Sequence, residues 1–400
     1  MAGFCLDCAR RRCYNFRMKY DVAIIGAGAS GLYLASLLAG SDLSVALIEA
    51  GDRVGRKLSA TGNGQGNLTN TAVCAERYHG DRALISLIAG SDYESVLGAF
   101  PFSFSADSRG RVYPLGRQAS ALTDALRRTV GAAKNIDVML SSRVRSLEKG
   151  YTVIFDDGRR ITADKAVLCT GGKAQKQLGS DGSGYEIAAR FGHTVTPLLP
   201  SLVQIKTDAE HIRTLKGLRA DCMVTARSGG RVLGSARGDV IFADYGVTGS
   251  AVFSVSYFVT GLSGVTLDIA FLPDTDEETV TRDVRRKLSA GYEHGELLSG
   301  TLNNQIGRAV MRRCPSSDPA EIARAVKHFT LSVQGTLGFD SAQVTRGGIP
   351  TNEVTDDLES VYSQGLYFAG EILDVDGECG GLNLHWAFSC ARRIAEGLLS

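Results

Sequence analysis

The sequence predicts an α/β protein in which a doubly wound, parallel-sheet domain is interrupted by a second domain of mostly antiparallel strands. Three observations lead to this fold class: a strand, a glycine-rich turn and a helix near the N-terminus, alternating short strands in the middle, and a strand with a long helix at the end. A chain of 400 residues is long enough for two or three domains. We expect the first domain to comprise residues 20–195 and 335–400, with residues 196–334 inserted between its two segments.

The elements of the first domain follow from short apolar runs and from the helical spacing of apolar residues. The order strand, helix, strand at the N-terminus forms a βαβ unit, whose strands are expected to lie parallel in one sheet. Residues 52–70 show no periodicity and are rich in Gly, Asn and Thr, which predicts a structured loop. In order, we expect strands at 20–25 and 44–48, helices at 30–38 and 118–130, a hairpin and strand within 151–169, a strand at 366–369 and a helix at 384–399.

The inserted segment changes character, because its apolar residues alternate over short runs. This pattern predicts an antiparallel barrel or sandwich. Within it, a helical patch over about 275–330 contains helical spacing at 277–294 and a second helix at 319–329, introduced by Asp318 and Pro319. The strands are expected at 202–206, 222–226, 240–242, 251–259 and 265–269.

A G-x-G-x-x-G motif lies between the first strand and the first helix, formed by Gly26, Gly28 and Gly31. The first glycine permits the tight turn, the second lets the backbone approach a pyrophosphate, and the third allows close helix–strand packing. Glu49 closes the second strand, where an acid accepts hydrogen bonds from a ribose diol. The motif in this setting predicts a dinucleotide site rather than chance glycine packing.

Two distant segments favour FAD over NAD. A strand ends in the turn Thr170-Gly171-Gly172, and a later strand ends in Gly370-Glu371. A flavin dinucleotide extends far enough to contact such segments, and Glu371 is suited to bind a polyol such as the ribityl chain. No second G-x-G-x-x-G follows a strand, so NAD(P)H, if it donates electrons, is expected to bind transiently at the flavin.

Glycines at 380 and 381 precede the last helix, with Asn383 in its first turn. A helix N-terminus beside the pyrimidine edge of a flavin stabilises the negative charge that reduction places there. A plain helix start is the alternative.

Composition excludes several classes of partner. The formal net charge of +1 argues against nucleic acid and anionic membranes, and no apolar run is long enough to span a bilayer. Nine scattered cysteines indicate reduced thiols and a cytoplasmic protein rather than a disulfide framework. Residues 1–18 show no periodicity and predict a disordered tail. Cys5, Cys8 and Cys13 within it lack a fourth zinc ligand, and no metal is expected.

The sequence resembles the aminoacetone-oxidase/BaiN-like family of FAD-binding flavoproteins over residues 20–399. The resemblance lies in YDVAIIGAGASGL (20–32), GRVYP (110–114), FADYGVTGSAVFSVS (242–256) and GLYFAGEILDVDGECGGLNLHWAF (365–388). It implies a Rossmann-like FAD domain, an inserted β-barrel-like domain and a small helical subdomain. By position, the residues implied to contact FAD are Gly26, Gly28, Ser30, Gly31, Glu49, Arg56, Lys57, Asn63, Asn67, Thr69, Val144, Thr170, Gly171, Gly370, Glu371 and Asn383.

Two departures from the family pattern fall where we expect the flavin. The family commonly has GRCN where this chain has Gly64-Gln65-Gly66-Asn67, and Gln where it has His385. His385 is a weak candidate for a proton donor, and Tyr245 is a candidate for the wall of the substrate cavity. Cys379 is interpreted as structural rather than redox-active, because it has no C-x-x-C partner.

These observations predict an FAD-dependent oxidoreductase that acts on a small organic substrate, with the inserted domain shaping the substrate pocket. The resemblance leaves two chemistries open, oxidation of an amine and reduction of an unsaturated cyclic compound. A flavin monooxygenase and a non-catalytic flavin-binding sensor are the alternatives from other classes.

Overall fold

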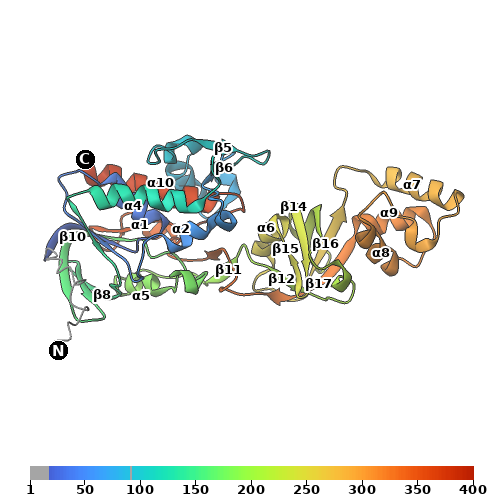
Figure 1. The fold of residues 1–400 in the computed structure, drawn as a ribbon. Coiled ribbons are helices and arrows are strands. Elements are labelled where there is room, and N and C mark those ends of the chain that lie inside the picture. The colour runs from blue at the N-terminus through green and yellow to red at the C-terminus, as the bar shows by residue number, and fades with distance from the viewer. Residues whose placement is uncertain (1–17, 91) are drawn as a thin grey trace, which may run out of the picture.

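The computed structural model describes residues 18–90 and 92–400. The molecule is elongated, with the sheet domain at one end, a barrel in the middle and a group of helices at the other end (Figure 1). Residues 1–17, which carry the predicted tail and the three N-terminal cysteines, lie outside the described residues. No helix in the described part of the chain combines the length and the apolar character needed to cross a membrane.

A seven-stranded sheet of order β7-β2-β1-β10-β9-β8 forms the first domain, and β19 also pairs with β10. Strands β7, β2, β1, β10 and β19 run parallel, so their carboxyl ends meet at one edge of the sheet. The strands are β1 (Lys19–Ile25), β2 (Val45–Ile48), β7 (Ile136–Met139), β8 (Val144–Glu148), β9 (Thr152–Phe155), β10 (Arg160–Leu168) and β19 (Leu366–Phe368).

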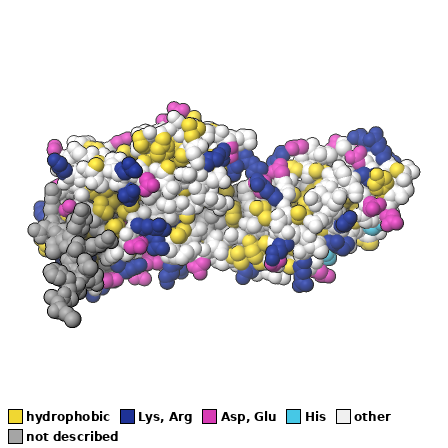
Figure 2. Space-filling model, viewed as in Figure 1, with side chains coloured by type: hydrophobic (Ala, Val, Ile, Leu, Met, Phe, Trp, Pro, Cys, Tyr) yellow, Lys and Arg dark blue, Asp and Glu magenta, His cyan; other side chains and the backbone are white. Residues whose placement is uncertain are grey.

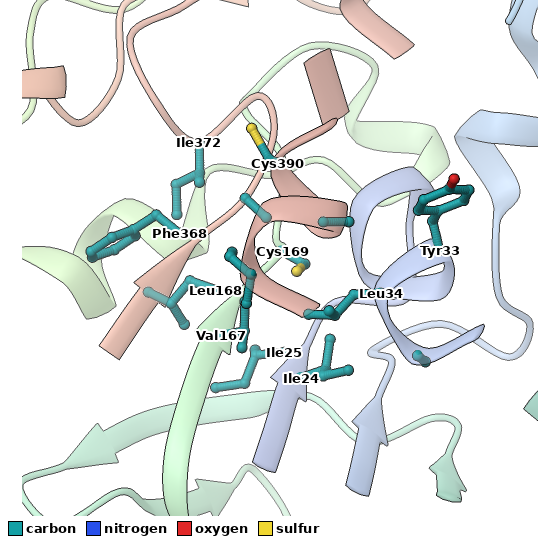
Figure 3. Packing of buried hydrophobic residues seen from close by; sticks show 14 of the residues in the cluster. Ile24, Ile25, Tyr33, Leu34, Val167, Leu168, Cys169, Phe368, Ile372 and Cys390 are labelled. Atoms are coloured by element: carbon teal, nitrogen blue, oxygen red, sulfur yellow. The ribbon is translucent and has the colours of Figure 1, made fainter. Parts of the chain in front are cut away.

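Helices α1 (Ala29–Leu37) and α10 (Leu382–Leu399) pack on each other and on the sheet. Figure 3 shows part of the buried core around the sheet, where Ile24 pairs in register with Val167, and Leu168 pairs with Ile25 and Phe368. Ile24 therefore projects to the opposite face of the sheet from Leu168 and Phe368. The close packing of α1 on its own strand depends on Gly31, because a Cβ there would lie 1.9 Å from the Gly26 carbonyl oxygen. The other helices of this domain are α2 (Arg56–Ala60), α3 (Arg82–Ile88), α4 (Ala119–Ala132) and α5 (Ser183–Arg190).

Three small sheets complete the first domain and connect it to the second. The hairpin of β5 and β6 pairs with β3, and β4 pairs with β20. The pair of β11 and β18 lies where the chain leaves the first domain and returns to it. Their bounds are β3 (Thr69–Asn70), β4 (Tyr78–His79), β5 (Phe104–Ala106), β6 (Arg111–Pro114), β11 (Leu199–Ser201), β18 (Val344–Arg346) and β20 (Asp376–Gly377).

The inserted segment forms a closed barrel of order β12-β15-β14-β13-β16-β17, which is one of the two predicted alternatives. Three helices extend from one end of it and share its hydrophobic core. The predicted fold class is thus confirmed. The elements are β12 (Ile205–Thr207), β13 (Arg219–Ser228), β14 (Arg231–Ala243), β15 (Gly246–Thr248), β16 (Val265–Phe271), β17 (Phe329–Thr336), α7 (Glu277–Ser289), α8 (Asn304–Arg313) and α9 (Pro319–Lys327).

The strand predicted at 251–259 is wrong: this segment belongs to helix α6 (Ser250–Val259). Its valines and aromatic residues favour strands in isolation. In the folded chain one face of the helix packs against β14, and its buried positions are Ala251, Val252, Val255, Ser256 and Val259. The aromatic residues of the helix are only partly buried. Packing against the barrel therefore overrides the local β preference.

Candidate active site

A cavity of about 770 Å³ lies at the carboxyl ends of β1, β2 and β10. Its opposite wall comes from the barrel and from α6, through residues such as Ile241, Thr248 and Phe253. The volume falls in the range of ligand pockets, about 300–1,000 Å³. The cavity therefore joins the glycine-rich turn of the first domain to the inserted domain.

The fold brings most of the predicted cofactor residues to this cavity. Gly31, Thr69 and Gly370 are the three that do not line it; Gly31 packs α1 on β1, and Thr69 is fully buried. The predicted residues that line the cavity are Gly26, Gly28, Ser30, Glu49, Arg56, Lys57, Asn63, Asn67, Val144, Thr170, Gly171, Glu371 and Asn383.

The start of α1 fits a pyrophosphate. Gly28 is the N-cap residue, no side chain caps the helix, and a Cβ at Gly28 would meet no atom within 4 Å. Since the first N–H groups of a helix have no partner within the helix, they remain available to an anion in the adjacent cavity. Ser30 holds this turn to the last segment of the domain, because its hydroxyl donates to the carbonyl oxygen of Ala369 at 3.2 Å.

Glu49 sits at the end of β2 in contact with the glycine-rich turn. Its Oε2 accepts a hydrogen bond from the N–H of Ala27 at 3.0 Å, and its Oε1 accepts from the N–H of Gly51 at 2.7 Å. The carboxylate therefore shapes the turn as well as facing the cavity, where its remaining lone pairs are available to a ribose.

Three buried polar atoms of the cavity lining lack a partner among the described residues: Nε of Arg56, Oγ1 of Thr170 and Oε1 of Gln204. Burying a polar group without a hydrogen bond is unfavourable, so such atoms indicate a missing ligand. Two of these atoms, on Arg56 and Thr170, belong to the first domain, where the open start of α1 fits a dinucleotide. Lys57, by contrast, already forms an ion pair with Glu371 at 2.8 Å.

The start of α10 also borders the cavity. Gly381 has φ +100°, and a Cβ there would lie 2.4 Å from the carbonyl oxygen of Thr69, so only glycine fits. The amide of Asn383 is bound to the backbone of Gly377, donating to its oxygen at 2.8 Å and accepting from its N–H at 2.9 Å. Asn383 therefore fixes the turn before the helix.

The two weak catalytic candidates do not line the cavity. His385 is fully buried; its Nδ1 lies 2.8 Å from the hydroxyl of Thr69, and its Nε2 lies 2.9 Å from the carbonyl oxygen of Ala89. Tyr245 lies in the turn between β14 and β15 and is half-buried. The geometry does not bring either side chain to the site.

The two positions at which the chain departs from the GRCN pattern, Gln65 and Gly66, lie in different surroundings. Gln65 lines the cavity, and its amide oxygen accepts a hydrogen bond from Arg117 at 3.3 Å. Gly66 has φ +81° and packs on α4, where a Cβ would lie 3.1 Å from the Cα of Ala119. Only the first of these positions faces the cavity.

Among the lining residues that sequence reasoning missed are Arg111 and Tyr113 on β6. Residues two apart on a strand project to the same face, so this alternation was a usable signal. Sequence reasoning also missed the barrel residues, which include Arg219 and Asp239, because no local pattern indicates that they meet the first domain.

A doubly wound domain with an open dinucleotide cradle and a shared cavity with a second domain defines a flavin-dependent oxidoreductase. The chain belongs to the family described as HI0933-like protein Rossmann domain, which matches residues 20–397. The protein is an FAD-dependent enzyme of this family, as the sequence resemblance predicted.

Two relatives match over nearly the whole chain. A Clostridium scindens protein named 3-dehydro-bile acid delta(4,6)-reductase is 36% identical over 395 residues, covering 92% of this chain and 96% of its own. An Escherichia coli protein named ribosomal RNA dihydrouridine synthase is 28% identical over 403 residues, covering 96% of this chain and 98% of its own.

Among solved structures, the 3-ketosteroid-delta4-(5alpha)-dehydrogenase of Rhodococcus jostii RHA1 is similar with a TM-score of 0.52 and 14% identity, covering 97% of this chain and 98% of its own. At this identity the similarity shows the fold alone.

Proposed function

We propose that this enzyme reduces a carbon–carbon double bond conjugated with a carbonyl group in a cyclic compound. The names of the two relatives, a delta(4,6)-reductase and a dihydrouridine synthase, both describe the addition of hydrogen to such a bond. Reduction of an unsaturated cyclic compound is also one of the two chemistries left open by the sequence. FAD, when bound, supplies the hydride for this reaction.

The observation that carries the proposal is the pair Arg111 and Tyr113 on the cavity face of β6. Arg111 binds the carboxylate of Asp107 through Nε at 2.8 Å and through Nη2 at 2.6 Å. The N–H groups on Nη1 of Arg111 have no partner among the described residues. Tyr113 is buried, and its hydroxyl likewise makes no hydrogen bond within residues 18–90 and 92–400.

These two groups match the needs of the reaction. A guanidinium that donates to the substrate carbonyl oxygen stabilises the negative charge that develops there when hydride reaches the β-carbon. The α-carbon then takes a proton, which the Tyr113 hydroxyl is placed to donate. Burial raises the pKa of Tyr113, while the charge of Arg111 acts in the opposite direction, so the phenol remains protonated at neutral pH.

The charge of the lining favours this chemistry over amine oxidation. Seven basic and four acidic side chains line the cavity, which suits an anionic transition state better than a protonated amine. NAD(P)H as the electron donor stays a prediction. The absence of a nucleic-acid partner also stays a prediction, because one relative acts by name on ribosomal RNA.

The test is anaerobic stopped-flow spectroscopy of the FAD-loaded enzyme. We expect NADH or NADPH to reduce the flavin, and a steroid 4,6-dien-3-one or uridine to reoxidise it without oxygen. Reduction by amines, or reoxidation by oxygen alone, would contradict the proposal and favour an oxidase or monooxygenase. A flavin that no donor reduces would favour a sensor.

Tyr113→Phe tests the role of the hydroxyl. General acid catalysis typically contributes about 10²–10⁴-fold, so we expect reoxidation by the dienone to slow by at least the lower figure. Flavin reduction by the nicotinamide and FAD affinity should stay unchanged. Equal reoxidation rates in the variant and the wild type would remove Tyr113 from the mechanism.

A further inference from the structure

A second cavity of about 610 Å³ opens between the first domain and the barrel. Its wall shares Arg111, Ser250 and Cys379 with the first cavity, so the two spaces adjoin. Four arginines and two carboxylates line it. We propose that this cavity is a subsite for a carboxylate carried by the substrate, at a distance from the ring that is reduced. This inference rests on the proposed function only in identifying the bound molecule as the substrate.

The first support is the presence of unused donors. In Arg77, Nε binds Glu378 at 3.0 Å and Nη1 binds Asn70 at 3.1 Å, while Nη2 has no partner in the described part of the chain. In Arg109, Nη1 binds Asp239 at 3.2 Å and Nη2 lies 3.5 Å from Asp221, while Nε has none there.

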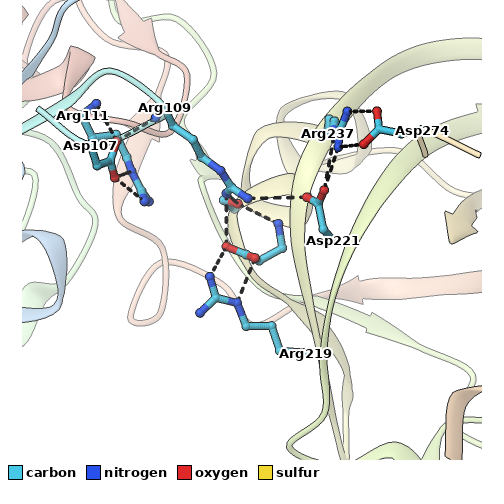
Figure 4. Close-up of polar contacts among 9 residues, drawn as sticks. Asp107, Arg109, Arg111, Arg219, Asp221, Arg237 and Asp274 are labelled. Atoms are coloured by element: carbon cyan, nitrogen blue, oxygen red, sulfur yellow. Dashed lines mark hydrogen bonds and ion pairs between the residues drawn. The ribbon is translucent and has the colours of Figure 1, made fainter. Parts of the chain in front are cut away.

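The second support is the preorganisation of these guanidinium groups. Figure 4 shows Arg109 extending from the hairpin between β5 and β6 to carboxylates on the barrel strands. On the barrel, Nη2 of Arg237 donates to Asp221 at 3.0 Å and to Asp274 at 2.5 Å. Because the network fixes the arginines before a ligand arrives, less side-chain entropy is lost when an anion binds.

A third group in the wall is the hydroxyl of Ser254 on α6, which makes no hydrogen bond with any described residue. The free N–H groups of Arg77 and Arg109 together with this hydroxyl supply donors of the kind that a carboxylate accepts. Both carboxylates in the wall are already bound by arginines, through both oxygens of Asp221 and through Oε2 of Glu378.

The charge of the surroundings favours a small acid over RNA. RNA binding depends on repeated phosphate contacts along a basic surface. Basic and acidic side chains are interspersed on the face in Figure 2, and the formal net charge of the chain is +1. With two carboxylates already in the wall, four arginines suit one added negative charge better than a polyanion.

The experiment compares a 3-oxo-4,6-diene bile acid with its methyl ester, which removes only the charge. Binding to the FAD-loaded full-length enzyme is measured by isothermal titration calorimetry, and turnover is measured separately. Charge-assisted hydrogen bonds predict that the wild type binds the acid about 10–100-fold more tightly than the ester. We expect Arg109→Gln and Arg77→Gln each to reduce this ratio at least about fivefold, with kcat for the ester little changed.

Arg231→Gln is the matched control, because Arg231 is an exposed arginine of β14 that lines neither cavity. It should keep the wild-type ratio. Two arginine variants are used because Arg109 also bridges the domains; the FAD absorbance of each shows whether it is folded.

Equal affinities for acid and ester in the wild type, or a ratio unchanged in both arginine variants, would overturn the inference. Displacement of the acid by a uridine oligonucleotide whose own affinity depends on Arg77 and Arg109 would overturn it in favour of RNA. An arginine-dependent preference for the acid without any turnover would support the subsite while refuting the proposed reaction.

Discussion

Gly28→Val separates cofactor binding from folding, because Gly28 tolerates a side chain in the protein but not beside a pyrophosphate. Its φ of −77° is ordinary for any residue, and a Cβ there would meet no atom within 4 Å. The added isopropyl group would instead occupy the cavity at the start of α1. We therefore expect an apo-protein that folds normally and binds FAD poorly.

The magnitude follows from the hydrogen bonds that the side chain would block. Two charge-assisted bonds between the first N–H groups of α1 and the pyrophosphate contribute about 1.5–3 kcal/mol each. Their loss raises the Kd for FAD by roughly 10²–10⁴-fold. The Kd is measured by quenching of flavin fluorescence on titration of apo-protein, and the Tm of the apo-protein should stay within about 2 °C of the wild type.

The matched controls are other glycines. Gly98→Val also places a side chain in open space, but outside the cavity, so it should change neither quantity. Gly31→Ala should lower the Tm even without FAD, because its Cβ would lie 1.9 Å from the Gly26 oxygen. A folded Gly28→Val variant with an FAD affinity within threefold of the wild type would refute the phosphate-site assignment.

Two further predictions concern the same cofactor. Glu49→Gln offers only one acceptor oxygen to the N–H groups of Ala27 and Gly51, so it should lower the unfolding free energy of the apo-protein by about 1–3 kcal/mol in urea titrations and weaken FAD binding as well. Glu49→Asp, which keeps the charge, is the comparison. Flavin released by denaturation should chromatograph as FAD, and release of FMN alone would contradict the dinucleotide site.

The parts of the fold that the sequence predicted are those encoded by adjacent residues. The turn from Gly26 to Gly31 combines strand, turn and helix signals within one short segment, so its position at the edge of a parallel sheet followed directly. The return of the chain to the same sheet at β19 was predictable because a strand ending in Gly370-Glu371 repeats the local pattern of a nucleotide-binding edge.

What the sequence did not predict depends on contacts between distant segments. Arg111 and Tyr113 lie in a short strand whose place in the cavity is set by its pairing with β3 and β5. Arg109 and Asp239 are 130 positions apart in sequence, and they meet only because the barrel packs against the hairpin of β5 and β6. Helix α6 was misassigned for the same reason, since its apolar residues are buried by the barrel.

His385 shows how nearness in sequence can mislead. It follows the glycines that border the cavity, and Leu384 and Trp386 both line that cavity, yet the rotation of α10 directs the imidazole toward Thr69 and Ala89. The Ala89 oxygen can only accept, so Nε2 carries the proton and Nδ1 accepts from the Thr69 hydroxyl. A glutamine amide offers the same combination of one donor and one acceptor, so Gln could replace His at this position.

This exchange leads to a prediction on pH. Burial lowers the pKa of His385 below its usual value. Burial also lowers the pKa of His193, although the hydrogen bond that His193 donates to Glu353 acts in the opposite direction. The unfolded chain binds protons to both residues near pH 6.5, whereas the folded chain does so only at lower pH. Their contribution to stability is therefore complete above about pH 6.5 and is lost as the pH falls below it.

For one group this loss is at most about 1.4 kcal/mol per pH unit. His385→Gln keeps both hydrogen bonds and cannot titrate, so its unfolding free energy should fall less steeply than that of the wild type between pH 7.5 and 5.5, while His193 maintains part of the slope. Its FAD affinity and the pH profile of flavin reoxidation should match the wild type, because the side chain does not reach the cavity. If the stability slopes are equal and the pH profile of reoxidation shifts instead, His385 acts as a proton donor and the structural role assigned to it here is wrong.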